Sequence, residues 1–170
     1  IANWLPCHGA LRTEVREEDA ALRALLEARG FTGSPAAITQ KYDLAVKASE
    51  AVVLPPGFCI VDMLENQDFR SKKALTANAF QNRAEVRDVD VMAYEYARQS
   101  PSYEARYDLS VIDGTGRHVS ACEGFVDYAQ RMAEVERVCT HSDYRRLGLA
   151  EAVIRTCFHR LYANGVEVAY

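Results

Sequence analysis

A short loop between a strand pattern and a helix pattern constrains this chain more than any other stretch. Residues Ala133–Thr140 are expected to form a strand, and Glu151–Ala163 an amphipathic helix. Between them, Arg145–Ala150 has the spacing Arg/Gln-x-x-Gly-x-Gly/Ala. Small residues at Gly148 and Ala150 let a phosphate group approach the backbone, and the first N–H groups of a helix have no intrahelical partner. The loop therefore predicts a pyrophosphate-binding site that needs no metal.

Two alternatives to this interpretation stay open. The first is an ordinary strand–turn–helix in which Gly148 only eases a bend. Turn and capping residues in His141–Tyr144, together with the apolar strand and the amphipathic helix, favour the binding loop instead. The second is a P-loop-like nucleotide binder, which is disfavoured because no Gly-Lys-Ser/Thr follows the glycine. The apolar face of the helix consists of Ala150, Val153, Ile154, Cys157, Phe158 and Leu161.

The stretch Val138–Ala150 resembles the acetyl-CoA signature of the GNAT N-acetyltransferase superfamily. In that family a strand with an apolar end is followed by x-Pro-x-Tyr-Arg and then by the Arg/Gln-x-x-Gly-x-Gly/Ala loop. Ser142 replaces the usual proline, and Ala150 replaces the more frequent final glycine. The surroundings resemble the family from about Gly57 to Tyr170.

The resemblance implies that acetyl-CoA is the cosubstrate and that the acceptor is a primary amine of a small molecule or peptide. It implies that the loop binds the pyrophosphate and that the preceding strand binds the pantetheine arm through its backbone. The loop residues are Arg145, Arg146, Leu147, Gly148, Leu149 and Ala150, and the strand residues are Val138, Cys139 and Thr140. The alternative to an enzyme is a non-catalytic module that binds CoA.

A carboxylate is the usual device that removes a proton from an amine before it attacks. Glu134 occupies the position at which several GNAT members carry a general-base glutamate. Glu136 lies two residues further along the strand and therefore on the same face. Solvated strand residues are the alternative for both, and Glu123 and Asp127 on the preceding strand are weaker candidates. The position of the tyrosine acid frequent in the family would lie beyond Tyr170, so no residue is assigned to that role.

Periodicity and turn residues predict the remaining elements. Strands are expected at 58–64, 107–112, 117–128 and 165–170, and helices at 66–80 and 86–100. Asp113–Gly116 is typical of a hairpin turn. This is the element order of the GNAT core up to its fifth strand, so the expected fold class is α+β. The resemblance implies a mixed, mostly antiparallel twisted sheet between layers of helices.

Three parts are expected along the chain: a first block at 1–47, a linker at 48–57 and the acetyl-CoA-binding core at 58–170. Within the first block, the sequence pattern predicts a strand at Ala10–Val15, a helix at Arg16–Gly30 and a strand at Ala36–Leu44. It resembles the C-terminal half of a GNAT domain, and a helical appendage is the alternative. Either the chain is a piece of a tandem GNAT protein, which we favour, or this block completes the sheet of the core.

Composition excludes several other classes of protein. A net charge of −4 and a pI near 5.6 argue against a general nucleic-acid binder, and no apolar run is long enough to span a membrane. The five cysteines and four histidines are scattered without zinc spacing, so no metal site is expected. Buried reduced thiols in a cytoplasmic protein are expected, and a homodimer is left open. No secretory signal is seen, but the chain begins at Ile1, which leaves room for an upstream piece.

The charged and aromatic segment Phe80–Tyr103 has two interpretations. It is either a solvated helical face or a wall that recognises a cationic amine.

Overall fold

The computed structural model describes residues 13, 15–34, 39–49 and 51–170. The chain forms two compact units, 1–39 and 40–170. In the first unit, helix α1 (Ala20–Glu27) begins where the Asp19 carboxylate accepts a hydrogen bond from the Leu22 N–H at 3.0 Å. The helix lies inside the predicted stretch Arg16–Gly30. The strand predicted at Ala10–Val15 falls mostly outside the described residues.

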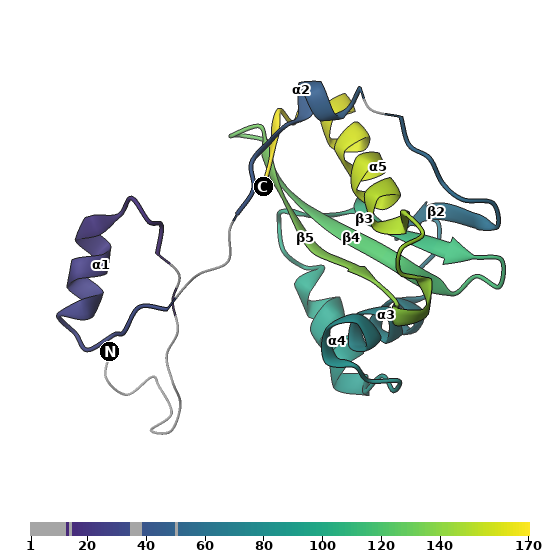
Figure 1. The fold of residues 1–170 in the computed structure, drawn as a ribbon, viewed down its shortest axis with the longest axis horizontal. Coiled ribbons are helices and arrows are strands. Elements are labelled where there is room, and N and C mark those ends of the chain that lie inside the picture. Colours follow the sequence, from purple (N-terminus) through teal and green to yellow (C-terminus); the bar gives the residue numbers. More distant parts are fainter. Residues whose placement is uncertain (1–12, 14, 35–38, 50) are drawn as a thin grey trace. The chain divides into compact units, whose positions relative to one another are not determined.

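The second unit contains a six-stranded sheet in the order β1-β6-β5-β4-β3-β2 (Figure 1). Neighbouring strands are antiparallel except β5 and β6, which are parallel. The strands are β1 (Tyr42–Asp43), β2 (Phe58–Asp62), β3 (Tyr103–Asp113), β4 (His118–Asp127), β5 (Met132–Thr140) and β6 (Val168–Ala169). The helices are α2 (Leu44–Lys47), α3 (Phe69–Gln81), α4 (Asp88–Ala97) and α5 (Leu149–Ala163). The predicted α+β fold with a mixed, mostly antiparallel sheet flanked by helices is confirmed.

Helix α5 packs on one face of the sheet, and α3 and α4 cover the other (Figure 1). The main hydrophobic core lies under α5, where Leu109, Val153 and Leu161 are fully buried. Gly124 in β4 allows the close approach of this helix, because an added Cβ would lie 3.2 Å from the Cys157 Sγ. Full burial of each such leucine contributes roughly 1.5–3 kcal/mol, so this face holds α5 firmly in place.

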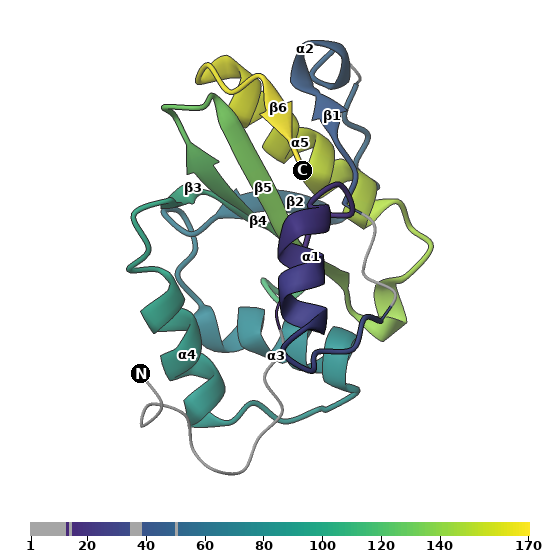
Figure 2. The same ribbon diagram turned by 90° about the vertical axis from the view of Figure 1, so that its left-hand side faces the viewer.

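The segment before the predicted linker contributes the edge strand of the sheet. Tyr42 and Asp43 pair with Ala169 and Val168, and Figure 2 shows β1 and β6 side by side. The strand expected at Ala36–Leu44 is shorter than predicted within the described residues. It stops because the Asp43 carboxylate accepts a hydrogen bond from the Ala45 N–H at 2.9 Å, which starts α2. Residues 42–47 therefore belong to the second unit.

The hairpin predicted at Asp113–Gly116 joins β3 to β4. The Asp113 carboxylate accepts hydrogen bonds from the N–H groups of Thr115 at 2.9 Å and Arg117 at 3.2 Å, which fixes the turn. Of the predicted buried thiols, Cys122, Cys139 and Cys157 are buried, whereas Cys59 is exposed, and all four are free. Cys59 is exposed because strand alternation turns it away from the core that Phe58 and Ile60 contact. Cys7 lies outside the described residues.

Candidate active site

The loop before α5 presents backbone donors without a capping side chain. Gly148 is the N-cap residue of α5 and has a φ of 77°, which favours glycine. The first helical hydrogen bond runs from the Ala152 N–H to the Gly148 carbonyl at 3.0 Å. No side chain of the described residues caps the helix. The N–H groups of Leu149, Ala150 and Glu151 therefore lie at its positive end without intrahelical partners. This arrangement suits an anion such as pyrophosphate.

The side chains of the loop divide between solvent and core. Arg145, Arg146 and Leu147 are exposed, whereas Leu149 is buried under the helix. Arg146 has a φ of 66°, a left-handed conformation that few non-glycine residues adopt, so the chain turns sharply before Gly148. The predicted loop residues are thus contiguous at the helix start. Leu149 offers its backbone alone, because its side chain anchors the helix.

Strand β5 has an open edge next to this loop. β6 pairs with β5 at Met132 and Ala133, and the Val135 N–H donates to the Tyr170 carbonyl at 2.8 Å. From Val138 to Thr140, β5 has no partner on that side among the described strands. Because β6 pairs only with the first part of β5, the edge of Val138–Thr140 that faces away from β4 is unpaired among the described strands, close to the loop.

Backbone directions along this open edge follow from one hydrogen bond. The His141 N–H donates to the Val119 carbonyl at 2.9 Å, which points it toward β4. Backbone groups alternate in direction along a strand, so Thr140 and Val138 direct theirs to the open edge. The Cys139 carbonyl faces β4 instead and accepts a hydrogen bond from the Ser120 hydroxyl at 2.8 Å. Of the three strand residues predicted to bind a ligand, Val138 and Thr140 therefore present backbone groups to the edge, and Cys139 does not.

The two predicted catalytic glutamates lie on the opposite face of the sheet from α5. Ala133 and Val135 pack in the core under α5, so alternation points Glu134 and Glu136 to the face that α3 and α4 cover. Both glutamates are exposed. Glu136 pairs across the ladder with Glu123 of β4, whose side chain is buried. The structure thus groups these carboxylates on one face, beside the open edge of β5.

A β-bulge follows Glu136 directly. The ladder pairs Glu123 with Glu136 and then Ala121 with Cys139, so Arg137 and Val138 oppose the single residue Cys122. Arg137 has a φ of 51°. Its guanidinium lies 3.3 Å from the Glu123 carboxylate. The bulge breaks the alternation of the strand and places a cation next to Glu123, on the face of the glutamates.

A buried polar network fixes α3 and α4 to the sheet. The Lys72 ammonium donates to the Asp108 carboxylate, and both side chains are sealed from solvent. The Tyr94 and Tyr103 hydroxyls donate to the same carboxylate, Tyr103 at 2.8 Å. Burial lowers the pKa of Lys72 to about 8, so the ammonium still carries its charge at neutral pH. Sequence patterns missed this network, because Lys72 and Asp108 look like ordinary surface charges.

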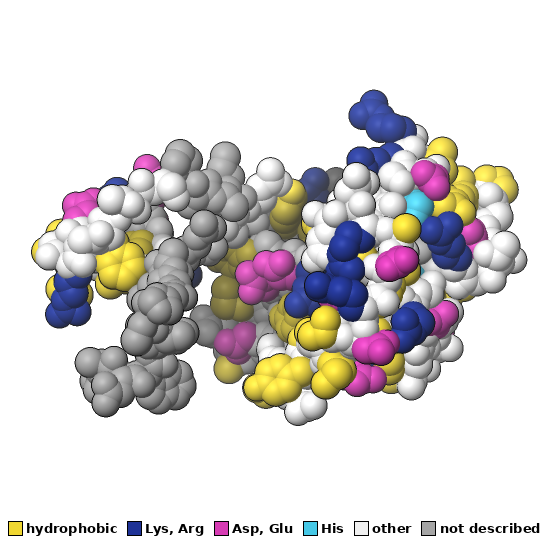
Figure 3. All heavy atoms as spheres, turned by 90° about the horizontal axis from the view of Figure 1, so that it is seen from below, with side chains coloured by type: hydrophobic (Ala, Val, Ile, Leu, Met, Phe, Trp, Pro, Cys, Tyr) yellow, Lys and Arg dark blue, Asp and Glu magenta, His cyan; other side chains and the backbone are white. Residues whose placement is uncertain are grey.

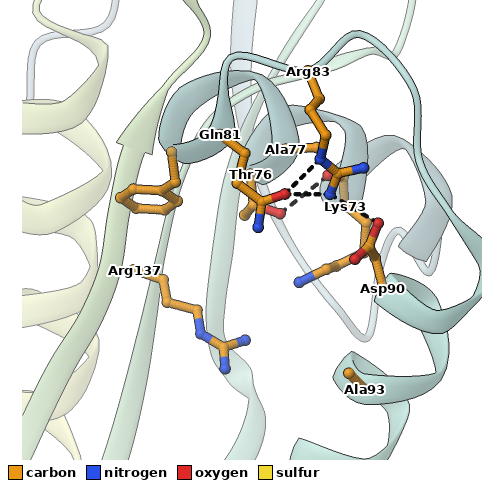
Figure 4. Close-up of a pocket in the computed structure, with 9 residues that line it drawn as sticks. Lys73, Thr76, Ala77, Gln81, Arg83, Asp90, Ala93 and Arg137 are labelled. Atoms are coloured by element: carbon orange, nitrogen blue, oxygen red, sulfur yellow. Dashed lines mark hydrogen bonds and ion pairs between the residues drawn. The ribbon is translucent and has the colours of Figure 1, made fainter. Parts of the chain in front are cut away.

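A pocket of about 220 Å³ lies between α3, the start of α4 and the bulge of β5 (Figure 4). It is lined by Lys73, Thr76, Ala77, Phe80, Gln81, Arg83, Asp90, Ala93 and Arg137. Seen from the side of α3 and α4, basic, acidic and apolar side chains are interspersed over the molecular surface (Figure 3). The pocket shares its face with Glu134 and Glu136. Sequence analysis missed Lys73 and Arg137 as lining residues, and no sequence signal marks them.

Arginine side chains bind the acidic residues of the segment 80–103 that lie near this pocket. Asp90 contacts Arg83 at 2.9 Å and Arg87 at 2.7 Å, and Asp88 contacts Arg70 at 2.5 Å. Hydrogen bonds from Arg87 and Arg83 hold the pKa of Asp90 well below its usual range. Asp88 and Asp90 are therefore paired with arginines in the structure.

The described residues form neither a membrane-spanning helix nor a metal-binding cluster. Within the described ranges, no helix combines the length and apolar character that a membrane span requires. The same residues contain no group of three or more His, Cys, Asp or Glu side chains that could hold a metal ion.

Comparisons with known proteins give the family. The family model described as Acetyltransferase (GNAT) family matches residues 74–170. A GCN5-related N-acetyltransferase from Sphaerobacter thermophilus has a similar structure, with a TM-score of 0.59 and 19% identity over 71% of this chain and 36% of that one. A GNAT family N-acetyltransferase from Escherichia coli, in complex with CoA, has a TM-score of 0.52 and 16% identity over 68% and 62%. This chain spans less than two thirds of either protein, and no curated protein matches it. Because the family model covers more than half of the chain, and the sheet and helices are those of its structural relatives, the chain belongs to the GNAT acetyltransferase family.

Proposed function

We propose that this chain transfers an acetyl group from acetyl-CoA to a primary amine by direct attack of the amine on the thioester. The observation that carries the proposal is the start of α5, where uncapped N–H groups follow the left-handed turn at Arg146 and Gly148. This donor cluster lies next to the open edge of β5, so one extended ligand can contact both. Family membership supports the same assignment.

The residues at this site suit acetyl-CoA, which would supply the activated acyl group. The backbone N–H groups at the start of α5 would bind its pyrophosphate, and the exposed Arg145 and Arg146 would add positive charge. The outward backbone groups of Val138 and Thr140 would bind the pantetheine arm. Space at the loop fits this role, because an added Cβ at Gly148 would meet nothing within 4 Å.

The acceptor amine must lose a proton before it attacks. Glu134 is the proposed general base, and Glu136, on the same face, is the second candidate. The carboxylate takes this first proton from the ammonium group. The N–C bond then forms as the C–S bond breaks, and the nitrogen gives its second proton to the departing CoA thiolate, so that CoA leaves as the thiol. An outward N–H of β5 would stabilise the negative charge that develops on the carbonyl oxygen.

Direct attack is favoured over an acyl-cysteine route by the state of Cys139. This thiol is the one nearest the proposed acyl site along the strand, and it is buried against Leu75 and Ala121. Burial raises its pKa to about 12, so it stays protonated at neutral pH and is a poor nucleophile.

Free thiols at all four described cysteines also support the proposal of a cytoplasmic location.

Calorimetric titration of the chain with acetyl-CoA, CoA and ATP tests this function. We expect both CoA species to bind and ATP to bind far more weakly, after which a screen of amines by release of the CoA thiol should give turnover. CoA binding without turnover of any amine would favour a non-catalytic CoA-binding module. A folded chain that binds neither CoA species would contradict the proposal.

A further inference from the structure

The pocket between α3, α4 and the bulge of β5 has an excess of positive charge. We name it the cationic pocket, after Lys73, Arg83 and Arg137 in its lining. Asp90 is its one lining carboxylate among the described residues, and it is bound to Arg83 and Arg87. Its charge is thus already compensated. The remaining cations of the lining are Lys73 and Arg137.

Lys73 and Arg137 reach into the same space from two different elements. Figure 4 shows the Lys73 ammonium extending from α3 and the Arg137 guanidinium from β5. The Lys73 ammonium lies 5.4 Å from the centre of the Tyr94 ring, and the Arg137 guanidinium contacts Glu123 at 3.3 Å. Burial and then the charge of Arg137 lower the pKa of Lys73, while Glu123 and Asp90 oppose this shift. Lys73 and Arg137 therefore line one space, and Glu123 already neutralises part of their charge. A small anion bound there would contact both cations.

The backbone of β5 directs Arg137 into this space at a cost in conformational free energy. A left-handed φ at a non-glycine residue is unfavourable by about 1–3 kcal/mol and persists where the surrounding structure requires it, often at a functional site. The bulge here moves Arg137 out of strand alternation, so it joins the lining of the pocket. Guanidinium groups bind carboxylates and phosphates through paired hydrogen bonds, which suits this placement to an oxyanion.

We infer that the cationic pocket binds an oxyanion of the acceptor substrate, so the acceptor is an amine that also carries a carboxylate or phosphate group. This inference rests on the proposed function, because it places the acceptor on the face of Glu134 and Glu136. Arg137 directly follows Glu136, the second candidate for the base, so an anion at the pocket lies on the face that both glutamates share. A pocket of about 220 Å³ has room for such a group but not for a large acceptor.

Binding of simple anions tests the inference without turnover. Succinate and inorganic phosphate are titrated calorimetrically into the chain, with and without saturating CoA. We expect wild type to bind at least one of them, and Lys73→Gln and Arg137→Gln to weaken binding by roughly tenfold or more, as the loss of a charge-assisted contact predicts. Arg137→Lys keeps the charge and should retain part of the affinity. Arg70→Gln is the matched control, because Arg70 is an exposed cation of α3 outside the pocket.

Matched acceptors then identify the anion and the site together. Release of the CoA thiol is compared for 4-aminobutyrate against butylamine and for phosphoethanolamine against ethanolamine. The acidic member of a pair should have the higher kcat/KM, and Lys73→Gln should remove that preference while acetyl-CoA affinity stays constant. If the chain prefers 4-aminobutyrate, the pocket binds a carboxylate; if it prefers phosphoethanolamine, the pocket binds a phosphate.

Several results would overturn the inference. A folded wild-type chain that binds neither anion contradicts it, and so does anion binding that Lys73→Gln and Arg137→Gln leave intact. If butylamine and ethanolamine, which lack an acidic group, are acetylated with equal or higher kcat/KM, the inference is wrong but the proposed acetyltransferase activity still holds. A wild-type chain that does not bind CoA contradicts the proposed function instead. In that case the anion titrations without CoA still decide whether the pocket binds anions.

Discussion

The Lys72 ammonium and the Asp108 carboxylate form an ion pair that is sealed from solvent between α3 and β3. The Tyr94 hydroxyl from α4 donates to the same carboxylate, so one buried charge connects both helices to the sheet. Removal of one partner from a buried pair leaves the other charge without compensation and costs about 3–5 kcal/mol. The pair therefore holds the helices that form the cationic pocket.

We expect Lys72→Met to lower the free energy of unfolding by about 3–5 kcal/mol, because Asp108 then stays buried without its cation. The double variant Lys72→Met/Asp108→Asn should lose much less than the sum of the two single losses. Urea denaturation of the four proteins measures this double-mutant cycle. Additive losses would show that the two side chains do not interact.

Stability should also fall in mild acid because of His118. Its side chain is fully buried beside Lys72, and burial followed by the Lys72 charge lowers its pKa to about 4 from 6.5. Between these two values the unfolded chain binds more protons than the folded chain, so stability falls as the pH decreases from 6.5 to 4. The loss from this residue should reach roughly 1.4 kcal/mol per pH unit in that window.

The free energy of unfolding of wild type and His118→Phe, measured in urea from pH 7.5 to 4.5, isolates this contribution. The carboxylates titrate in both proteins, so their effect largely cancels in the difference. The stability of wild type should fall more steeply with acid than that of the variant. Equal slopes would mean that His118 has the same pKa in the folded and the unfolded chain.

Local patterns predicted much of this fold. The helix α5, the glycine loop before it and the Asp113–Gly116 hairpin depend on residues close in sequence, where spacing and turn chemistry act directly. The predicted loop residues do lie together at a helix start. The same local reasoning failed at Leu44, where an aspartate cap ends the predicted strand.

Features that depend on pairing between distant segments were not predicted. The bulge at Arg137 arises from the register of β5 against β4, and strand alternation in the sequence gives no sign of it. The charges of Lys72 and Asp90 look like solvated surface, because Asp108 and Arg83, which bind them, come from outside their own helices. The cationic pocket was therefore not predicted from the sequence.

Glu134→Gln should lower kcat/KM roughly 100- to 10,000-fold if this carboxylate takes the amine proton. The acidic limb of the pH profile should disappear, while acetyl-CoA affinity, measured by calorimetry, should stay unchanged. Glu136→Gln is tested in parallel, and Glu95→Gln, an exposed residue of α4, serves as the control. A large effect of Glu136→Gln alone would move the base to Glu136. A normal pH profile in both variants would place the base elsewhere.

Gly148→Asp should abolish acetyl-CoA binding and leave the domain folded. The new carboxylate would stand at the start of α5, where it repels a pyrophosphate and fills the space that the ligand needs. The strain of a side chain at a φ of 77° costs about 1–2 kcal/mol, and an added Cβ meets no atom within 4 Å. Gly116→Asp is a matched control, because Gly116 has a φ of 84° and equally open space in the β3–β4 hairpin. Calorimetry with acetyl-CoA and a thermal melt of each variant decide the result: equal affinity of folded Gly148→Asp and wild type would refute the assignment of the loop.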